Sequence, residues 1–149
     1  MTSTQMITDP GIRAELEALI AEHAYRVDFC CSENLAELYT EDGVFVLPSG
    51  KEFSGREEVN TYGRDSAKKT DRLVRHVFTN FRLTADGPDQ IRGVSFVTLY
   101  RAQNRNSAPP EAVAVADAKD IYRRCSDGRW RIHERRIEVV FESDAHKQG

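Results

Sequence analysis

The stretch LVRHVFTNFRL, residues 73–83, is rich in β-branched and aromatic side chains and predicts one long β-strand. Three further runs of this kind follow it, at 91–101, 113–124 and 129–141. The connections between them are a turn at 86–88, a loop over 103–110 and a turn at 126–128. Four long strands in succession with short connections predict an antiparallel meander.

Upstream of these strands, apolar residues recur at steps of three and four, which is the period of a helix. The first predicted helix has Asp9 as its N-cap and Pro10 at its first position, and it ends near Cys31. A second, shorter helix over 32–41, a short strand over 44–47 and a third helix over 55–69 complete the predicted order.

Helices grouped before an antiparallel sheet predict an α+β domain, in which the three helices cover the concave face of the sheet. Strands of this length twist and coil strongly, so we expect a cone-shaped, mixed or antiparallel sheet with a hollow interior. The length of 149 residues favours a single domain, with a core over about 10–141 and frayed ends. A hollow of this kind is a natural site for a small molecule.

Composition and charge exclude several classes of protein. Hydrophobic residues make up 40% of the chain and the formal net charge is −3, which disfavours disorder and nucleic-acid binding. No apolar stretch is long enough to span a membrane, and residues 1–10 lack the pattern of a signal peptide. The three cysteines fit neither a disulfide framework nor a zinc site, so we expect a cytoplasmic, reduced protein without a metal.

Three polar residues of the first predicted helix are candidates for a site. His23 lies on the apolar stripe, and Asp28 lies at the edge of that stripe near the C-terminal end, where the helix dipole opposes a carboxylate. Tyr25 is three residues before Asp28, so the two side chains can meet on one face. Each also has an ordinary interpretation: a solvated Asp28, a core histidine at position 23 and a packed Tyr25.

The even-numbered face of the strand 73–83 holds a second group of candidates. Val74, His76, Phe78 and Asn80 alternate along this face. A mixture of apolar and neutral polar side chains is typical of a pocket wall, whereas a solvent-exposed face normally carries more charge. His76 can also serve only to form hydrogen bonds between strands, without a chemical role.

Charged residues in the last two predicted strands raise the same question. Asp117 interrupts the apolar run over 113–116, and Arg135 and Arg136 follow Trp130 in the final strand. The alternation alone does not decide which face points inward, and an exposed or ion-paired arginine is the ordinary alternative. One arginine that reached the pocket would orient an anionic or carbonyl group, because its donors form a rigid fork.

Several of these segments resemble the SnoaL-like branch of the nuclear transport factor 2-like superfamily. The likeness is carried by AYRVD (24–28), NLAELYTEDGVF (34–45), GREE (55–58), His76 with Asn80, and DGRWRI (127–132) leading into Arg135 and Arg136. It covers about residues 10–141 and is nearest to the group that contains scytalone dehydratase, bile acid dehydratase and lindane dehydrochlorinase. The fold it implies is a cystatin-like roll around a cavity.

The resemblance implies that Asp28 and His76 form a catalytic pair, since members of that group use an aspartate late in the first helix and a histidine on the strand after the third helix. His23 stands where relatives place a tyrosine or lysine that binds substrate. Arg136 matches a late arginine of the family best, with Arg135 as the alternative. Together with the strand patterns, this gives a predicted substrate-binding set of His23, Tyr25, Phe78, Asn80, Asp117 and Arg136. Relatives of this kind use no metal and no organic cofactor.

The predicted function is that of a cofactor-independent lyase or isomerase acting on a small hydrophobic, cyclic or polyketide-like molecule. His76 would take a proton from carbon while Asp28 fixes its tautomer, and Tyr25 or His23 would donate a hydrogen bond to the leaving group or developing oxyanion. One alternative is a non-catalytic ligand-binding or accessory domain, like the small subunit of ring-hydroxylating dioxygenases. Another is an epoxide hydrolase of the same fold that uses Asp117, Asp28 and an arginine.

We also predict a homodimer or larger homo-oligomer. The odd-numbered face of the strand 73–83 carries Leu, Val and Phe side chains. If this is the convex side of the sheet, another subunit would normally cover it. Neither nucleic acid nor a membrane is expected as a partner.

Overall fold

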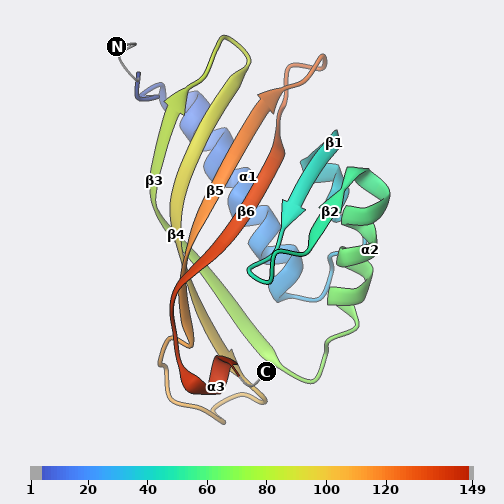
Figure 1. The fold of residues 1–149 in the computed structure, drawn as a ribbon, viewed down its shortest axis with the longest axis vertical. Coiled ribbons are helices and arrows are strands. Elements are labelled where there is room, and N and C mark those ends of the chain that lie inside the picture. Colours follow the sequence, from blue (N-terminus) through green and yellow to red (C-terminus); the bar gives the residue numbers. More distant parts are fainter. Residues whose placement is uncertain (1–4, 148–149) are drawn as a thin grey trace.

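The chain folds into one curved sheet with helices packed against its concave side (Figure 1). The computed structural model describes residues 5–147. The helical segments are α1 (Pro10–Asp28), the 3-10 turn η1 (Leu35–Leu38), α2 (Gly55–Ala67) and α3 (Asp144–Lys147). The strands are β1 (Tyr39–Val46), β2 (Glu52–Ser54), β3 (Leu73–Ala85), β4 (Gln90–Ala102), β5 (Ala114–Arg124) and β6 (Trp130–Glu142).

The strands form a six-stranded mixed sheet in the order β2-β1-β6-β5-β4-β3. The predicted meander is confirmed, because β3 to β6 pair antiparallel in sequence order, each within two residues of its predicted bounds. β1 starts five residues earlier than predicted and pairs parallel with β6. It also pairs antiparallel with β2, a short strand that the sequence did not predict. The α+β class and the curved mixed sheet are as expected.

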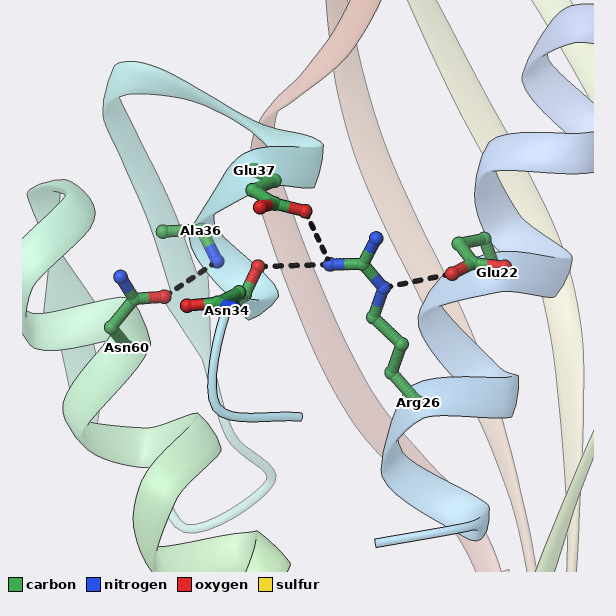
Figure 2. Close-up of polar contacts among 6 residues, drawn as sticks. All are labelled: Glu22, Arg26, Asn34, Ala36, Glu37 and Asn60. Carbon is green, nitrogen blue, oxygen red and sulfur yellow. Dashed lines mark hydrogen bonds and ion pairs between the residues drawn. The ribbon is translucent and has the colours of Figure 1, made fainter. Parts of the chain in front are cut away.

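The prediction of a second helix over 32–41 is wrong. This segment forms only the single turn η1, and the chain enters β1 immediately afterwards. Figure 2 shows that side chains from the two neighbouring helices bind backbone groups of this segment. Asn60 Oδ1 on α2 accepts a hydrogen bond of 2.9 Å from Ala36 N, and Arg26 Nη1 on α1 donates one of 2.9 Å to Asn34 O. The turn therefore ties the C-terminal end of α1 to α2.

The core fills only part of the space that the sheet encloses. Large buried side chains gather where α1 packs on the sheet, and they include Leu16, Ile20, Tyr39, Tyr122 and Ile132. Farther toward its start, β5 directs only Ala114, Ala116 and Ala118 inward. Because these three side chains are short, they leave room for a cavity between α1 and the sheet.

β-Bulges in β3 and β6 reverse which side chains point inward. In β3 the register shifts around Asn80, whose backbone is left-handed with φ 58°. Phe78 before this bulge and Leu83 after it therefore both contact the core, although one number is even and the other odd. In β6 a second shift falls between Ile132 and Arg135, both of which are buried. Side chains therefore do not alternate between the inner and outer faces of the sheet along the whole length of either strand.

Ordered structure extends beyond the predicted core at both ends. Ile7 N donates a hydrogen bond of 2.9 Å to Leu83 O, and Ala85 N donates one of 2.9 Å to Gln5 O, so the segment before α1 lies beside the end of β3. At the other end, α3 follows β6. Residues 1–4 and 148–149, which belong to the predicted frayed ends, lie outside the described residues. No described helix is long and apolar enough to cross a membrane.

Candidate functional site

A cavity of about 720 Å³, including its open mouth, lies between α1, β1, α2, α3 and the inner face of the sheet. Five polar side chains reach it: His23, Tyr62, His76, Arg135 and His146. The rest of the wall is apolar and is formed by Ala24, Val27, Phe45, Leu47, Pro48, Phe78, Val97, Leu99, Ala114, Ala116, Ile137 and Val139.

The structure brings Asp28 and His76 together at the wall of this cavity. Asp28 Oδ1 lies 2.5 Å from His76 Nδ1, and Asp28 Oδ2 accepts a hydrogen bond of 2.8 Å from the backbone N–H of His76. The side chain of Asp28 is 5% exposed, whereas that of His76 is 28% exposed. Since the carboxylate holds Nδ1, Nε2 is the ring nitrogen of His76 that remains for a ligand.

The end of α1 explains why Asp28 is held in this position. A left-handed Cys30 and a hydrogen bond of 2.9 Å from Cys31 N to Arg26 O form a Schellman motif. Asp28 is therefore the last helical residue, three residues before the predicted end. The helix dipole disfavours a carboxylate here, and the two hydrogen bonds from His76 offset that cost.

Arg135 reaches the cavity from β6, at the far side of the meander from β3. Its Nε and Nη2 each donate a hydrogen bond of 2.9 Å to the Asp120 carboxylate on β5. Tyr122 Oη donates to the same carboxylate at 2.6 Å. Arg135 Nη1 is buried and has no hydrogen-bond partner among the described residues, and the guanidinium carbon lies 5.0 Å from the centre of the Phe78 ring. A buried donor without a partner is able to bind an oxygen atom of a ligand.

Burial and the Asp120–Arg135 pair set the charge states of this region. Burial acts to lower the pKa of Arg135, but the Asp120 carboxylate outweighs it and raises that pKa above its ordinary value. Burial, reinforced by the charge of Asp120, raises the pKa of Tyr122 well above its ordinary value. Burial and then the charge of Arg135 hold the pKa of His23 well below 6.5, so this histidine is neutral at pH 7.

His23 lies in the cavity wall, as the sequence predicted, but its ring already has a protein partner. Its Nε2 lies 2.9 Å from Tyr39 Oη, and its ring packs edge-on against Phe45 with a centroid distance of 5.4 Å. Burial raises the pKa of Tyr39, so the phenol keeps its proton. The neutral His23 therefore shapes the cavity and holds Tyr39, and it carries no charge toward a ligand.

Four of the predicted substrate-binding residues do not line the cavity. Tyr25 is 52% exposed and stacks on Phe29 with a centroid distance of 4.7 Å. Asn80 is an exposed residue of the β3 bulge. Asp117 and Arg136 point to the convex face, because the inward positions are Ala116 and Ala118 on β5 and Arg135 on β6. Of the two arginines left open by the sequence, Arg135 is the one at the cavity. Asp117 is consequently not available for the epoxide hydrolase arrangement.

Asp120, Tyr62 and His146 were not predicted as site residues from the sequence. Asp120 follows Ala116 and Ala118 at every second position of β5, so the strand alternation could have placed its side chain on the inner face. It was missed because the apolar run of this strand ends before it. His146 reaches the cavity from α3, and its Nδ1 is buried without a hydrogen-bond partner among the described residues. His146 belongs to α3, a separate element, so the alternation of side chains along β6 could not predict that it reaches the cavity. Within residues 5–147, no group of three or more His, Cys, Asp or Glu side chains could hold a metal ion.

Solved structures with the same fold come from several bacteria. A protein of unknown function from Mycobacterium tuberculosis is 26% identical, with a TM-score of 0.73, over 86% of this chain and 76% of that one. A protein from Catenulispora acidiphila, solved in complex with S-DNPA, is 21% identical with a TM-score of 0.73, over 87% and 93% of the two chains. A proposed scytalone dehydratase from Novosphingobium aromaticivorans is 18% identical with a TM-score of 0.76, over 93% and 91%.

The sequence comparison gives the family. No functionally curated protein matches the chain in sequence. A family model described as a SnoaL-like domain matches residues 12–136, which is most of the chain. The curved sheet, the helices on its concave side and the cavity between them agree with that match. This protein therefore belongs to the SnoaL-like domain family.

Proposed function

We propose that this protein is a cofactor-independent lyase or isomerase that removes a proton from carbon in a small, largely apolar molecule. The observation that carries the proposal is the Asp28–His76 pair at the wall of an apolar cavity, which leaves His76 Nε2 for a ligand. The unpaired Nη1 of Arg135 supplies a second polar group at the same cavity. Apolar walls with a few placed polar groups are typical of sites for small organic molecules.

Each polar group has a defined part in the proposed reaction. His76 Nε2 takes the proton, and the electron pair of the broken C–H bond remains on the substrate. Asp28 fixes the tautomer of His76 and stabilises the imidazolium that forms. Arg135 Nη1 donates a hydrogen bond to the oxygen where negative charge develops. In elimination of a halide, the electron pair expels the halide ion. In elimination of water, it expels hydroxide, which takes the proton of the imidazolium and leaves as water. In isomerisation, the imidazolium returns the proton to another carbon.

The structural relatives support the ligand class of this proposal and no more. The Catenulispora acidiphila protein has the same fold and was solved in complex with S-DNPA. The Novosphingobium aromaticivorans relative is a proposed scytalone dehydratase. At 21% and 18% identity these similarities concern the fold, so the reaction of this chain is argued from its own residues.

Solvent deuterium exchange tests the proposal whatever the leaving group is. Cyclic ketones with and without a β-hydroxyl or β-halogen substituent are incubated with the protein in D2O, and NMR measures deuterium at the acidic carbon and loss of the substituent. His76→Gln and Asp28→Asn are expected to lower the rate by about 10²–10⁴. His133→Gln and Asp117→Asn, which change the same residue types outside the cavity, are the matched controls and should keep the rate within about twofold.

Two results would count against catalysis. Unchanged exchange in His76→Gln would remove His76 as the base. Ketones that bind in the cavity without exchanging any proton in the wild-type protein would favour the non-catalytic ligand-binding alternative.

We also propose that a second copy of this chain covers the convex face of the sheet. Val77, Val94 and Phe96 are 43%, 37% and 45% exposed and lie close together on β3 and β4. The prediction also placed Phe81 and Leu83 on this face, but the β3 bulge turns both toward the core. Light scattering should show a dimer or larger species that Phe96→Asp dissociates, and a wild-type species of only 16.9 kDa would contradict the idea.

A further inference from the structure

A second hollow adjoins the cavity at the end of the sheet where β3 begins and β4 ends. Including its open mouth it encloses about 510 Å³. It shares Val27, Tyr62, His76 and Leu99 with the cavity wall, so the two spaces meet at His76. Its other lining includes Lys69, Arg72 and Arg101, and no Asp or Glu among the described residues lines it. We call this space the basic hollow.

The three cations of the basic hollow have no carboxylate partner. Among the described residues, Lys69, Arg72 and Arg101 form no ion pair, whereas Arg26 and Arg135 each do. Arg101 Nε is buried and has no hydrogen-bond partner among residues 5–147. Such a donor costs stability unless another molecule satisfies it.

Arg101 is the centre of a wider basic region. It lines two further hollows at the same end of the sheet, one with Arg75 and Arg105 and one with Arg72 and the histidine of α3. No Asp or Glu among the described residues lines either of them. Burial and then the charge of Arg72 lower the pKa of Arg101, as expected for a partly desolvated cation that also lies near a like charge. A concave surface lined by one sign of charge concentrates ions of the opposite sign.

We propose that the basic hollow binds an anionic group, a carboxylate or a phosphate, on the molecule whose apolar body occupies the cavity. The inference deepens the proposed function, because it defines the substrate as an amphipathic anion. Val27, Leu99 and Tyr62 line both spaces, so the cavity and the basic hollow share a largely apolar wall beside His76. The part of the ligand that crosses from one space to the other lies beside His76, which places the reacting carbon between the apolar body and the anionic group.

Matched ligands that differ only in charge test the inference by calorimetry. Naphthalene-2-acetate is compared with its neutral amide, and 2-naphthyl phosphate is the phosphate probe. Wild-type protein should bind the carboxylate or the phosphate at least about tenfold more tightly than the amide, because charge-assisted hydrogen bonds replace the missing partners. The tighter of the two anions identifies the anionic group. In Arg72→Gln/Arg101→Gln the preference should disappear while the affinity for the amide stays within about twofold.

The control variant loses the same charge at the opposite end of the sheet. Arg82→Gln/Arg129→Gln changes two exposed arginines that do not line the cavity or the basic hollow. It should keep the full preference for the anions. Equal affinity of the wild-type protein for the anions and the amide would overturn the inference, as would a preference that survives in Arg72→Gln/Arg101→Gln.

Inorganic phosphate separates this inference from the proposed function, because it needs no apolar cavity. It should raise the melting temperature of the wild-type protein and of the control variant, but not that of Arg72→Gln/Arg101→Gln. If phosphate acts in this way and the amide does not bind, the proposed use of the cavity fails and the basic hollow stands. Equal stabilisation of all three proteins by phosphate would overturn the basic hollow. Without phosphate, Arg72→Gln/Arg101→Gln should be at least as stable as the wild-type protein, which shows that the variant folds.

Discussion

The Asp120–Arg135 pair allows a quantitative test of how the cavity is held together. Both side chains are 1% exposed, two hydrogen bonds of 2.9 Å join them, and Tyr122 adds a third to the carboxylate. Asp120→Asn keeps the shape of the side chain and removes its charge, which leaves the guanidinium buried without an anion. Removing one partner of a buried ion pair costs about 3–5 kcal/mol of unfolding free energy.

This free energy converts to a large change in melting temperature. An unfolding entropy of about 2.1 cal/mol/K per residue over 149 residues makes each kcal/mol worth about 3 °C. Asp120→Asn should therefore melt about 10–16 °C below the wild-type protein. Urea unfolding, followed by the fluorescence of Trp130, which is buried in the core, gives the free energy directly.

A second variant isolates the charge. Asp120→Asn/Arg135→Met removes the stranded guanidinium as well, so it should recover about 2 kcal/mol or more of the loss. Asp89→Asn breaks the exposed pair with Arg124 and should cost no more than about 1 kcal/mol. A double variant less stable than Asp120→Asn alone would refute the argument, since the buried charge would then not be the source of the loss. An Asp120→Asn variant as stable as Asp89→Asn would do the same.

Two other features of the fold give predictions. The folded pKa of His23 lies below 6.5, so the unfolded chain binds the proton first as the pH falls; its contribution to stability is complete above pH 6.5 and is lost below it. Between pH 7.5 and 5.5 the wild-type protein should therefore lose up to about 1.4 kcal/mol more unfolding free energy than His23→Gln, and parallel pH profiles would contradict this. A Cβ at Gly63 would lie 1.9 Å from Ser32 O, so Gly63→Ala should destabilise by about 1–3 kcal/mol in urea unfolding although alanine favours helix. Thr61→Ala, at an exposed position of α2, should change stability by less than about 0.5 kcal/mol, and an equal effect of both variants would remove the steric explanation.

The sequence by itself determined α1, α2, the four long strands β3 to β6 and the order in which they follow one another. Runs of β-branched and aromatic residues such as 73–83 and 91–101 define the strands, since their side chains suit a pleated surface whatever packs against it. The N-cap at Asp9 and the apolar residues that recur every three or four positions after it define α1, and both signals lie within the helix itself. Because α1 ends at Asp28 and β3 starts just before His76, the order of elements together with the family resemblance was enough to predict that these two residues meet.

Only the tertiary structure decided which charged residues reach the cavity. The bulges in β3 and β6 each shift the alternation by one position, which exchanges inward and outward side chains. For this reason Asn80 is exposed, and Arg135 lies at the cavity where Arg136 was favoured. Bulges depend on how neighbouring strands pair and coil, so the period of one strand does not reveal them.

The basic hollow depends on the tertiary structure even more strongly. Lys69 follows α2, Arg72 precedes β3, and Arg101 is near the end of β4, so no local pattern connects them. The antiparallel pairing of β3 with β4 brings the start of one strand beside the end of the other, which gathers the three cations next to His76. The strands form because of the local preferences of their side chains, whereas the three cations come together only because segments distant in the sequence pack side by side.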